Sequence, residues 1–305
     1  MHCVSRDALR LSASSRIRSL LSDGRIDLVH VNEAHALTAS WLAGAHRRVP
    51  VLSSRRIGFP LKKNLVSRAR YRSLACFIAN SRNVAQSLVA CGISPDRIAI
   101  VNEGVEIPSP VDTPERAAAR KKWDVREGDF LFGCASAFVP EKGQHHVVQA
   151  LATVQKEFPN ARLLLVGEGK CRREVEALAA KLRLQQSVST PGFVTHMREF
   201  YSALDAFVFP SEFEGLGTAL QAAMAYGMPV VSTTRGALGE VVEDQRTALV
   251  AEPNAGDLAT AMLRLLRDQT LRQRLGQAGR EEMKLRFSAD RMVDNTVRVY
   301  EKVSA

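Results

Sequence analysis

The sequence predicts an α/β protein built from two domains with parallel sheets. Short apolar segments typical of buried strands alternate with stretches typical of helices, which is the pattern of parallel sheets. The 305 residues are enough for two such domains. Pro108, Pro110 and Pro114 punctuate the middle of the chain, and we interpret this stretch as the linker between the domains.

The individual elements follow in order along the chain. Strands are predicted at residues 26–31, 49–53, 75–79 and 97–101, and a helix at 34–45. Ser81 is the predicted N-cap of a helix that ends at Gly92. The second half is expected to begin near Asp129, with a first strand at 130–135. Its later strands are centred near Leu163, Val188, Phe207, Val230 and Leu249, and a last helix covers 289–303.

Composition is that of an ordinary globular protein, with 46% hydrophobic and 24% charged residues. No apolar run approaches the ~18 residues of a membrane span. The first residues lack the charged-then-apolar pattern of a signal peptide. The five cysteines are scattered without metal-ligand spacing, which favours reduced thiols. We therefore expect a cytoplasmic protein, peripheral on the cytoplasmic face of the membrane if it contacts one.

The positive charge is concentrated in residues 47–82. This segment contains ten basic residues and no acidic one, which equals the net charge of +10 of the whole chain. Apolar residues such as Phe59 and Leu65 are interleaved with the charges. Such a segment suits an anionic membrane surface or a phosphorylated lipid, at roughly 1 kcal/mol per charge. Nucleic acid is not expected as a partner, because no nucleic-acid-binding module accompanies the patch. A solvated loop and helix face is the simpler alternative.

Residues 211–231 are the most informative stretch for function, because they predict a sharp loop and a helix between two buried strands. Gly215 and Gly217 would let the backbone approach a ligand closely. The free N–H groups of the following helix favour phosphate. Glu214 can accept hydrogen bonds from hydroxyl groups. A site for both phosphate and polyol indicates a nucleotide sugar, although glycines placed for packing alone would give a similar pattern.

Several motifs resemble those of the retaining glycosyltransferases of family 4. Glu214-Gly215-Leu216-Gly217, with the residues that follow it to Val231, is similar to that family's donor-site motif. Residues 139–143, 161–169 and 191–193 fall in the family's order. The resemblance covers the chain from about Ile26 to its end. It implies a GT-B fold, in which two doubly wound, Rossmann-like parallel-sheet domains face each other across a cleft.

The resemblance also implies where the domains lie along the chain and which substrate each one binds. Residues 1–110 would form the acceptor-side domain, 111–286 the nucleotide-sugar-binding domain, and 287–305 a helix that crosses back to the first domain. Only 25 residues precede Ile26, and they contain no glycine-rich loop. We therefore expect the N-terminal domain to be truncated by roughly 60 residues, about two βα units. A misassigned start, a truncated gene and a natural short variant would all give this sequence.

Roles in the donor site can be assigned by resemblance. Lys142 would neutralise the leaving nucleoside diphosphate, and Glu214 would position the hydroxyls of the donor sugar. Both are assigned as catalytic residues, although a surface lysine and a capping carboxylate are the structural alternatives. The remaining donor-binding residues are a phosphate-binding loop and a segment beside the nucleobase: Gly215, Leu216, Gly217 and Thr218, and Gly192, Phe193 and Val194.

Two positions depart from the family pattern. The arginine expected five residues before Lys142 is Ala137, which weakens the inferred contact with the diphosphate. The second glutamate, expected eight residues after Glu214, is Ala222, which cannot bind the ribose hydroxyls. Gln221 is adjacent but lies about 100° around the helix, so we expect it to be a poor substitute.

Acceptor-side candidates follow the first two predicted strands, at the edge where open α/β sheets bind ligands. The family often carries a histidine at the position of Asn32, and His30 and His35 flank that position. His35 is taken as the catalytic candidate, with a structural role as the alternative. Arg55 and Arg56 are candidates for an acceptor phosphate or carboxylate, or for contact with a membrane.

These features together predict a retaining glycosyltransferase. It would transfer a sugar from a UDP-, GDP- or ADP-sugar to a hydroxyl of a lipid-linked or anionic glycan of the cell-envelope or lipopolysaccharide type. No metal or other cofactor is expected, because Lys142 and a helix dipole would replace the cation and no Asp-x-Asp triplet follows a strand. The alternative is a truncated or degenerate homologue that binds a partner, membrane or nucleotide without turnover. A nucleotide-sugar epimerase or phosphorylase fits the Glu214 region less well.

Overall fold

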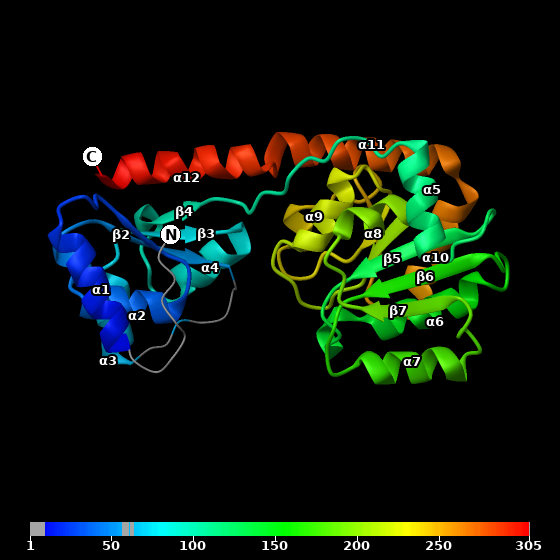
Figure 1. The fold of residues 1–305 in the computed structure, drawn as a ribbon, viewed down its shortest axis with the longest axis horizontal. Coiled ribbons are helices and arrows are strands. Elements are labelled where there is room, and N and C mark those ends of the chain that lie inside the picture. The colour runs from blue at the N-terminus through cyan, green and yellow to red at the C-terminus, as the bar shows by residue number, and fades with distance from the viewer. Residues whose placement is uncertain (1–9, 57–60, 62–63, 305) are drawn as a thin grey trace. The chain divides into compact units, whose positions relative to one another are not determined.

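The computed structural model of the chain describes residues 10–56, 61 and 64–304. The chain forms two compact units, each with its own parallel sheet (Figure 1). The first unit comprises Met1–Asn102 together with Asp290–Ala305, and the second is Glu103–Ala289. Both sheets are parallel throughout their described strands, so the α/β class predicted from the alternating pattern is confirmed.

The first unit contains a four-stranded sheet in the order β1-β2-β3-β4. The strands are β1 (Val29–Val31), β2 (Val51–Arg55), β3 (Cys76–Ala79) and β4 (Ile98–Ile100). The α-helices are α1 (Arg10–Ser22), α2 (Ala34–Leu42), α3 (Leu65–Arg72), α4 (Arg82–Ala90) and α12 (Ala289–Ser304), and the short 3-10 helices are η1 (Ala45–Arg47) and η2 (Pro95–Arg97).

Local chemistry explains where these elements begin. Ser81 caps α4, as predicted, because its hydroxyl accepts a hydrogen bond from the Val84 N–H at 3.2 Å. Strand β1 is shorter than the predicted 26–31. Its partner β2 is preceded by Pro50, which has no N–H to donate, so the ladder begins with Val29 opposite Val51.

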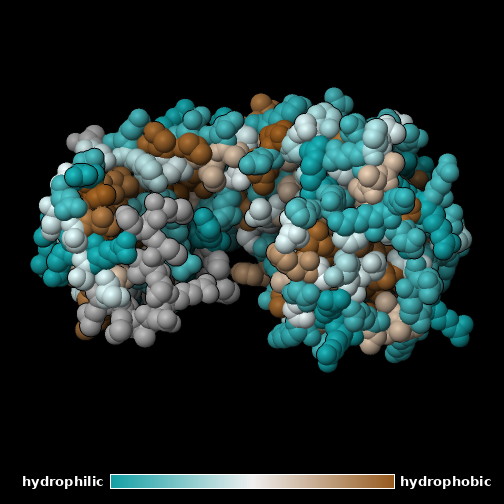
Figure 2. All heavy atoms as spheres, viewed as in Figure 1, coloured by the Kyte–Doolittle hydropathy of each residue, from teal (hydrophilic) through white to brown (hydrophobic). Residues whose placement is uncertain are grey.

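Two apolar clusters cover the two faces of the four-stranded sheet. One includes Val51 and Phe77 and is closed by residues of α1, α2 and α4. The other includes Leu52 and Ile78 and is packed by four residues of α12: Met292, Val299, Tyr300 and Val303. The surface drawn in Figure 2 is largely hydrophilic, with small hydrophobic groups that include part of α12. Among the described residues, no helix is both long and apolar enough to cross a bilayer.

The second unit contains a six-stranded sheet in the order β10-β9-β8-β5-β6-β7. The strands are β5 (Phe130–Ala135), β6 (Ala161–Val166), β7 (Val188–Gly192), β8 (Ala206–Phe209), β9 (Val230–Ser232) and β10 (Leu249–Val250). The helices are α5 (Thr113–Lys122), η3 (Pro140–Lys142), α6 (Gln144–Val154), α7 (Arg172–Lys181), α8 (Met197–Ala203), α9 (Thr218–Ala225), η4 (Leu238–Glu240), α10 (Ala255–Arg267) and α11 (Gln269–Arg286).

Strand alternation gives this sheet two buried faces. Leu131 and Phe207 belong to one cluster, which α8 and α9 cover, whereas Phe132 and Val208 belong to the other, which α6 and α10 cover. The first strand of the unit, β5, lies between β6 and β8, so the strand order reverses there. This is the doubly wound arrangement, in which ligands bind beyond the carboxyl ends of the strands that flank the reversal.

Candidate functional site

Lys142 and Glu214 lie beyond the two strands that flank the reversal. Lys142 ends η3, which follows β5, and Glu214 lies in the loop between β8 and α9. Because β5 and β8 are parallel neighbours, both side chains come from the same edge of the sheet. Although 72 residues apart in the sequence, the two side chains meet there.

The two side chains form an ion pair in which Lys142 Nζ lies 2.5 Å from Glu214 Oε2. Both are largely shielded from solvent, with exposed side-chain fractions of 18% and 20%. Glu214 Oε1 also accepts a hydrogen bond from the Gly215 N–H at 3.1 Å, and Lys142 Nζ is 3.4 Å from the Phe213 carbonyl oxygen. A fixed cation next to a fixed carboxylate can serve a ligand that carries both phosphate and hydroxyl groups.

Backbone and hydroxyl hydrogen bonds hold the two segments together. The Glu212 N–H donates to the Glu141 carbonyl oxygen at 2.8 Å, and the Ser211 hydroxyl donates to the same oxygen at 3.2 Å. Thr233 Oγ1 donates to the Ser211 carbonyl oxygen at 2.6 Å, which ties the loop to the end of β9. The position of Lys142 relative to Glu214 is therefore fixed by more than their own ion pair.

Gly236 supports the Glu214 loop from behind. Its φ is +69°, and a Cβ at this position would lie 2.0 Å from the Glu214 carbonyl oxygen. That same oxygen accepts a hydrogen bond from the Ala237 N–H at 3.1 Å. Only glycine allows both the left-handed backbone and this close approach. Gly236 lies 22 residues beyond Glu214 and no local motif marks it, so its role could not be predicted from the sequence.

The other predicted donor-binding residues lie at the same edge of the six-stranded sheet. Gly217, with φ +69°, precedes the first residue of α9, Thr218, which is exposed, whereas Leu216 is buried in the core. At the end of β7, Gly192 is buried with φ +91°. Phe193 follows it with 74% of its surface exposed, and Val194 packs partly against the core. Phe193 thus presents a large apolar surface that a planar ring could cover.

The two departures from the family pattern have different surroundings. The Ala137 carbonyl oxygen accepts a hydrogen bond from Gln144 Nε2 at 2.9 Å. Ala222 is partly buried against the core. Its neighbour Gln221 is fully buried and donates through Nε2 to the Glu103 carbonyl oxygen at 3.3 Å. Gln221 is therefore committed to the fold and is not positioned to replace the glutamate that Ala222 lacks.

The acceptor-side candidates lie at the carboxyl edge of the four-stranded sheet. Asn32 and His35 follow β1 and are exposed, and Arg55 and Arg56 come at the end of β2. The neighbouring His30 is committed to structure, because its ring nitrogens lie 2.7 Å from Tyr300 Oη and 2.8 Å from Ser54 Oγ. Burial, with a contribution from Arg56, lowers the pKa of His30. His30 thus links α12 to the sheet.

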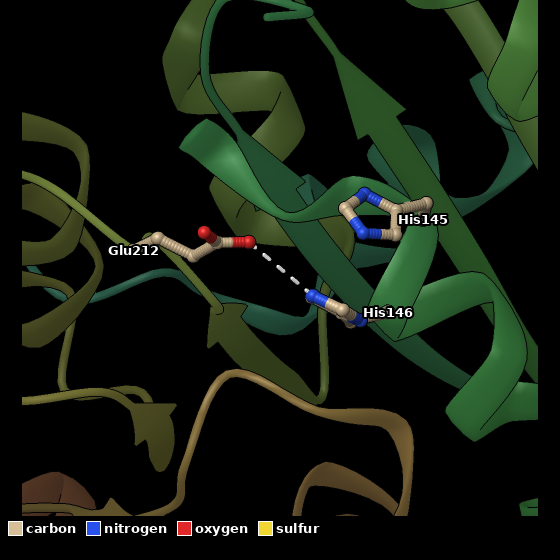
Figure 3. Close-up of side chains that lie close together, drawn as sticks. All are labelled: His145, His146 and Glu212. Atoms are coloured by element: carbon tan, nitrogen blue, oxygen red, sulfur yellow. Dashed lines mark hydrogen bonds and ion pairs between the residues drawn. The ribbon is translucent and has the colours of Figure 1, made fainter. Parts of the chain in front are cut away.

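A second group of polar side chains adjoins the Lys142 segment. His145 and His146 start α6, and Glu212 lies opposite them in the loop after β8 (Figure 3). Burial and the adjacent His146 lower the pKa of His145, although Glu212 opposes this change. This group was not predicted from the sequence, because His146 and Glu212 are 66 residues apart and only the fold brings them together.

Family models match most of the chain. The model of the glycosyl transferases group 1 matches residues 115–282, which is more than half of the chain. The chain belongs to this family. The model of glycosyltransferase family 4 matches residues 4–107. The resemblance read from the Glu214 motif is therefore confirmed, and both candidate residues of the ion pair lie within the group 1 match.

Named relatives are found among archaea, bacteria and plants. The chain is 34% identical over 182 residues to an uncharacterized glycosyltransferase, MJ1178, of Methanocaldococcus jannaschii, covering 58% of this chain and 50% of the relative. It is 31% identical over 199 residues to the GDP-mannose-dependent monoacylated alpha-(1-6)-phosphatidylinositol monomannoside mannosyltransferase of Corynebacterium glutamicum. This alignment covers 60% of this chain and 52% of the relative. These alignments span about half of each relative. A phosphatidyl-myo-inositol mannosyltransferase of Mycobacterium leprae is 28% identical, covering 99% of this chain and 80% of the relative.

Solved structures share the fold. A glycosyltransferase from Rickettsia africae superposes with a TM-score of 0.87 at 21% identity, covering 99% of this chain and 84% of that one. HepE of Anabaena, solved in complex with UDP and glucose, gives a TM-score of 0.82 at 20% identity, covering 98% of this chain and 84% of HepE. The GT-B class, with two Rossmann-like parallel-sheet domains, is therefore confirmed.

Proposed function

We propose that the chain acts as a retaining glycosyltransferase that uses a nucleoside-diphosphate sugar as donor. The observation that carries this proposal is the Lys142–Glu214 pair at the strand-order reversal of the six-stranded sheet. The ammonium group suits the diphosphate, and the carboxylate suits the sugar hydroxyls. The N–H groups at the start of α9 add partial positive charge on the same side.

In the proposed reaction, the bond between the anomeric carbon of the sugar and the diphosphate oxygen breaks. Lys142 neutralises the charge that develops on this oxygen, while Glu214 holds the sugar through its hydroxyls. The acceptor hydroxyl attacks from the face that the diphosphate leaves, and its proton passes to the departing phosphate. Configuration at the anomeric carbon is therefore retained. Because Lys142 is paired with Glu214 in the free protein, donor binding must exchange that contact for phosphate and hydroxyl contacts.

The donor and acceptor classes are proposed from chemistry and from relatives. HepE was solved with UDP-glucose, and the Corynebacterium relative is named GDP-mannose-dependent, so a UDP- or GDP-sugar is the first choice and an ADP-sugar the next. For the acceptor we propose a lipid-linked or anionic glycan of the cell envelope, as in lipopolysaccharide, held near His35, Asn32, Arg55 and Arg56. Two relatives carry phosphatidylinositol lipids in their names.

The basic segment 47–82 supports a peripheral contact with an anionic membrane on the cytoplasmic face. Its helix α3 exposes Leu65 and Val66 beside the exposed Arg68 and Arg72. Part of the segment is used within the fold, since Arg70 NH2 donates to Ser67 Oγ at 2.8 Å. Residues 57–60, 62 and 63 of the segment lie outside the described residues.

Replacing Glu214 with glutamine tests the division of roles within the pair. The variant Glu214→Gln keeps the size of the side chain but releases Lys142 from its partner. We expect affinity for the sugar nucleotide to fall by about tenfold, since a charge-assisted contact with the sugar is lost. Affinity for the free nucleoside diphosphate should be equal or higher. Saturation-transfer NMR titrations with UDP, GDP, ADP and their sugars measure both affinities on the same sample.

Two results of these titrations would contradict the proposal. Equal losses for the sugar nucleotide and the free nucleotide would contradict the proposed contact between Glu214 and the sugar. Binding of none of the nucleotides by a folded wild-type chain would contradict the donor site. That result would favour a homologue that binds a partner or membrane without turnover, as Ala137 and Ala222 suggest.

Transfer should not require a metal ion. In the proposed reaction Lys142 and the start of α9 supply the positive charge that a divalent cation supplies in other enzymes. With saturating donor and a suitable acceptor, we expect the rate to persist after treatment with EDTA. Abolition of transfer by EDTA and its recovery with Mn²⁺ would overturn this account of the chemistry.

A further inference from the structure

Two imidazoles and one carboxylate converge next to the Lys142–Glu214 pair. His145 and His146 project from the first turn of α6, and the Glu212 carboxylate points toward them from the loop after β8 (Figure 3). Each residue offers one nitrogen or oxygen atom, and these three atoms lie within 4.8 Å of one another. Both histidines are partly buried, whereas Glu212 is exposed, so the group opens to solvent on the carboxylate side.

The spacing of these atoms is close to that of a tetrahedral metal site. Zinc bonds to nitrogen and oxygen measure about 2.0–2.1 Å, which places tetrahedral ligand atoms about 3.3–3.4 Å apart. His146 Nε2 and Glu212 Oε1 already lie 3.3 Å apart. The His145 and His146 rings have centroids 3.8 Å apart at an interplanar angle of 44°. The distances that remain to be closed involve His145, and because no two of the three atoms are more than 4.8 Å apart, each closes by at most about 1.5 Å to reach the ideal spacing.

We propose that His145, His146 and Glu212 form a binding site for a transition-metal dication such as Zn²⁺. Two imidazole nitrogens and a carboxylate oxygen are the ligand types that zinc, nickel and cobalt accept, whereas Mg²⁺ prefers oxygen ligands alone. With three protein ligands, the fourth position is left to water, so the site is of the open, exchangeable kind.

A metal at this position would join the start of α6 to the loop after β8. These are the segments that carry Lys142 and Glu214, and the hydrogen bond from the Glu212 N–H to the Glu141 carbonyl oxygen already links them. The ion would therefore act as a cross-link that stabilises this part of the six-stranded domain. It takes no part in the transfer chemistry proposed above, and the inference does not depend on that chemistry.

Zinc titration of the tag-free full chain tests the site. Chelator-treated wild type is compared with His146→Ala and Glu212→Gln by isothermal titration calorimetry with Zn²⁺. The visible absorption of Co²⁺ reports tetrahedral coordination in the same samples. His196→Ala is the matched control, because His196 is an exposed histidine of the same domain outside the group. Other donors in the chain, including His2 and Cys3, are the same in every sample and cancel in the comparison.

Wild type and His196→Ala should each bind one Zn²⁺ with equal affinity. In His146→Ala and Glu212→Gln the affinity for this ion should be at least about tenfold lower. Zinc should raise the Tm of the first two proteins but not of the other two. Equal Tm values of all four proteins without metal would show that the variants fold. Equal zinc affinity of all four proteins would overturn the proposal. Loss in His146→Ala with full affinity in Glu212→Gln would also overturn it, because the metal would then not join the two segments.

Discussion

Replacing Lys142 with alanine is expected to lower the rate of sugar transfer by about 10²–10³-fold, the loss typical when one stabiliser of developing charge is removed. The variant Lys142→Ala removes the cation that would face the diphosphate. It also leaves the largely shielded Glu214 carboxylate without its partner, 2.5 Å from where the ammonium nitrogen had been. That carboxylate would then repel the diphosphate. Steady-state rates and nucleotide affinities, measured together, report both effects.

Controls separate the loss of positive charge from the repulsion by Glu214. Lys156→Ala removes an exposed lysine beyond the other end of α6, and its rate should equal that of wild type. In the double variant Lys142→Ala/Glu214→Gln, affinity for the free nucleoside diphosphate should recover in part, because the repelling charge is gone. The rate should stay low, since nothing neutralises the leaving group. The loss of a group that stabilises developing charge lowers a rate far more than threefold. A rate for Lys142→Ala within about threefold of wild type would therefore show that Lys142 does not act on the diphosphate.

Local pattern was sufficient to predict most of the fold. The strand at 130–135 was predicted with its observed limits, because its continuous apolar run ends in small residues before the η3 turn. The predicted start of β1 was wrong by three residues, since it depends on Pro50, which precedes the neighbouring strand β2. Short strands take their limits from their partners, which a single stretch of sequence does not contain.

In the candidate site, too, local motifs predicted single residues but not the contacts between distant segments. Lys142 and Glu214 were each found from a local motif, but their ion pair follows from the adjacency of β5 and β8 in the sheet. Gly236 and the group of His145, His146 and Glu212 have no local signature. Their roles arise from contacts between segments far apart in the chain, and only the three-dimensional structure reveals them.

Replacing Gly236 with alanine is expected to disable the Glu214 loop. The new Cβ would lie 2.0 Å from the carbonyl oxygen of Glu214 and 3.1 Å from its backbone nitrogen. Backbone atoms cannot rotate away as a side chain can, so the loop must shift and carry the Glu214 carboxylate with it. We expect affinity for the sugar nucleotide to fall by at least about tenfold. The Tm should fall as well, since a left-handed backbone alone costs an alanine roughly 1–2 kcal/mol.

Gly128→Ala is the matched control for this variant. Gly128 also has a positive φ, +84°, but a Cβ there would meet nothing within 4 Å. Both substitutions remove similar freedom from the unfolded chain, so that contribution cancels between them. The Tm of Gly128→Ala should fall only by the amount that the backbone strain causes. Its affinity for the sugar nucleotide should equal that of wild type. If the two variants bind it equally well, Gly236 does not hold Glu214 in place, and the loop adapts without loss of its contact with the sugar.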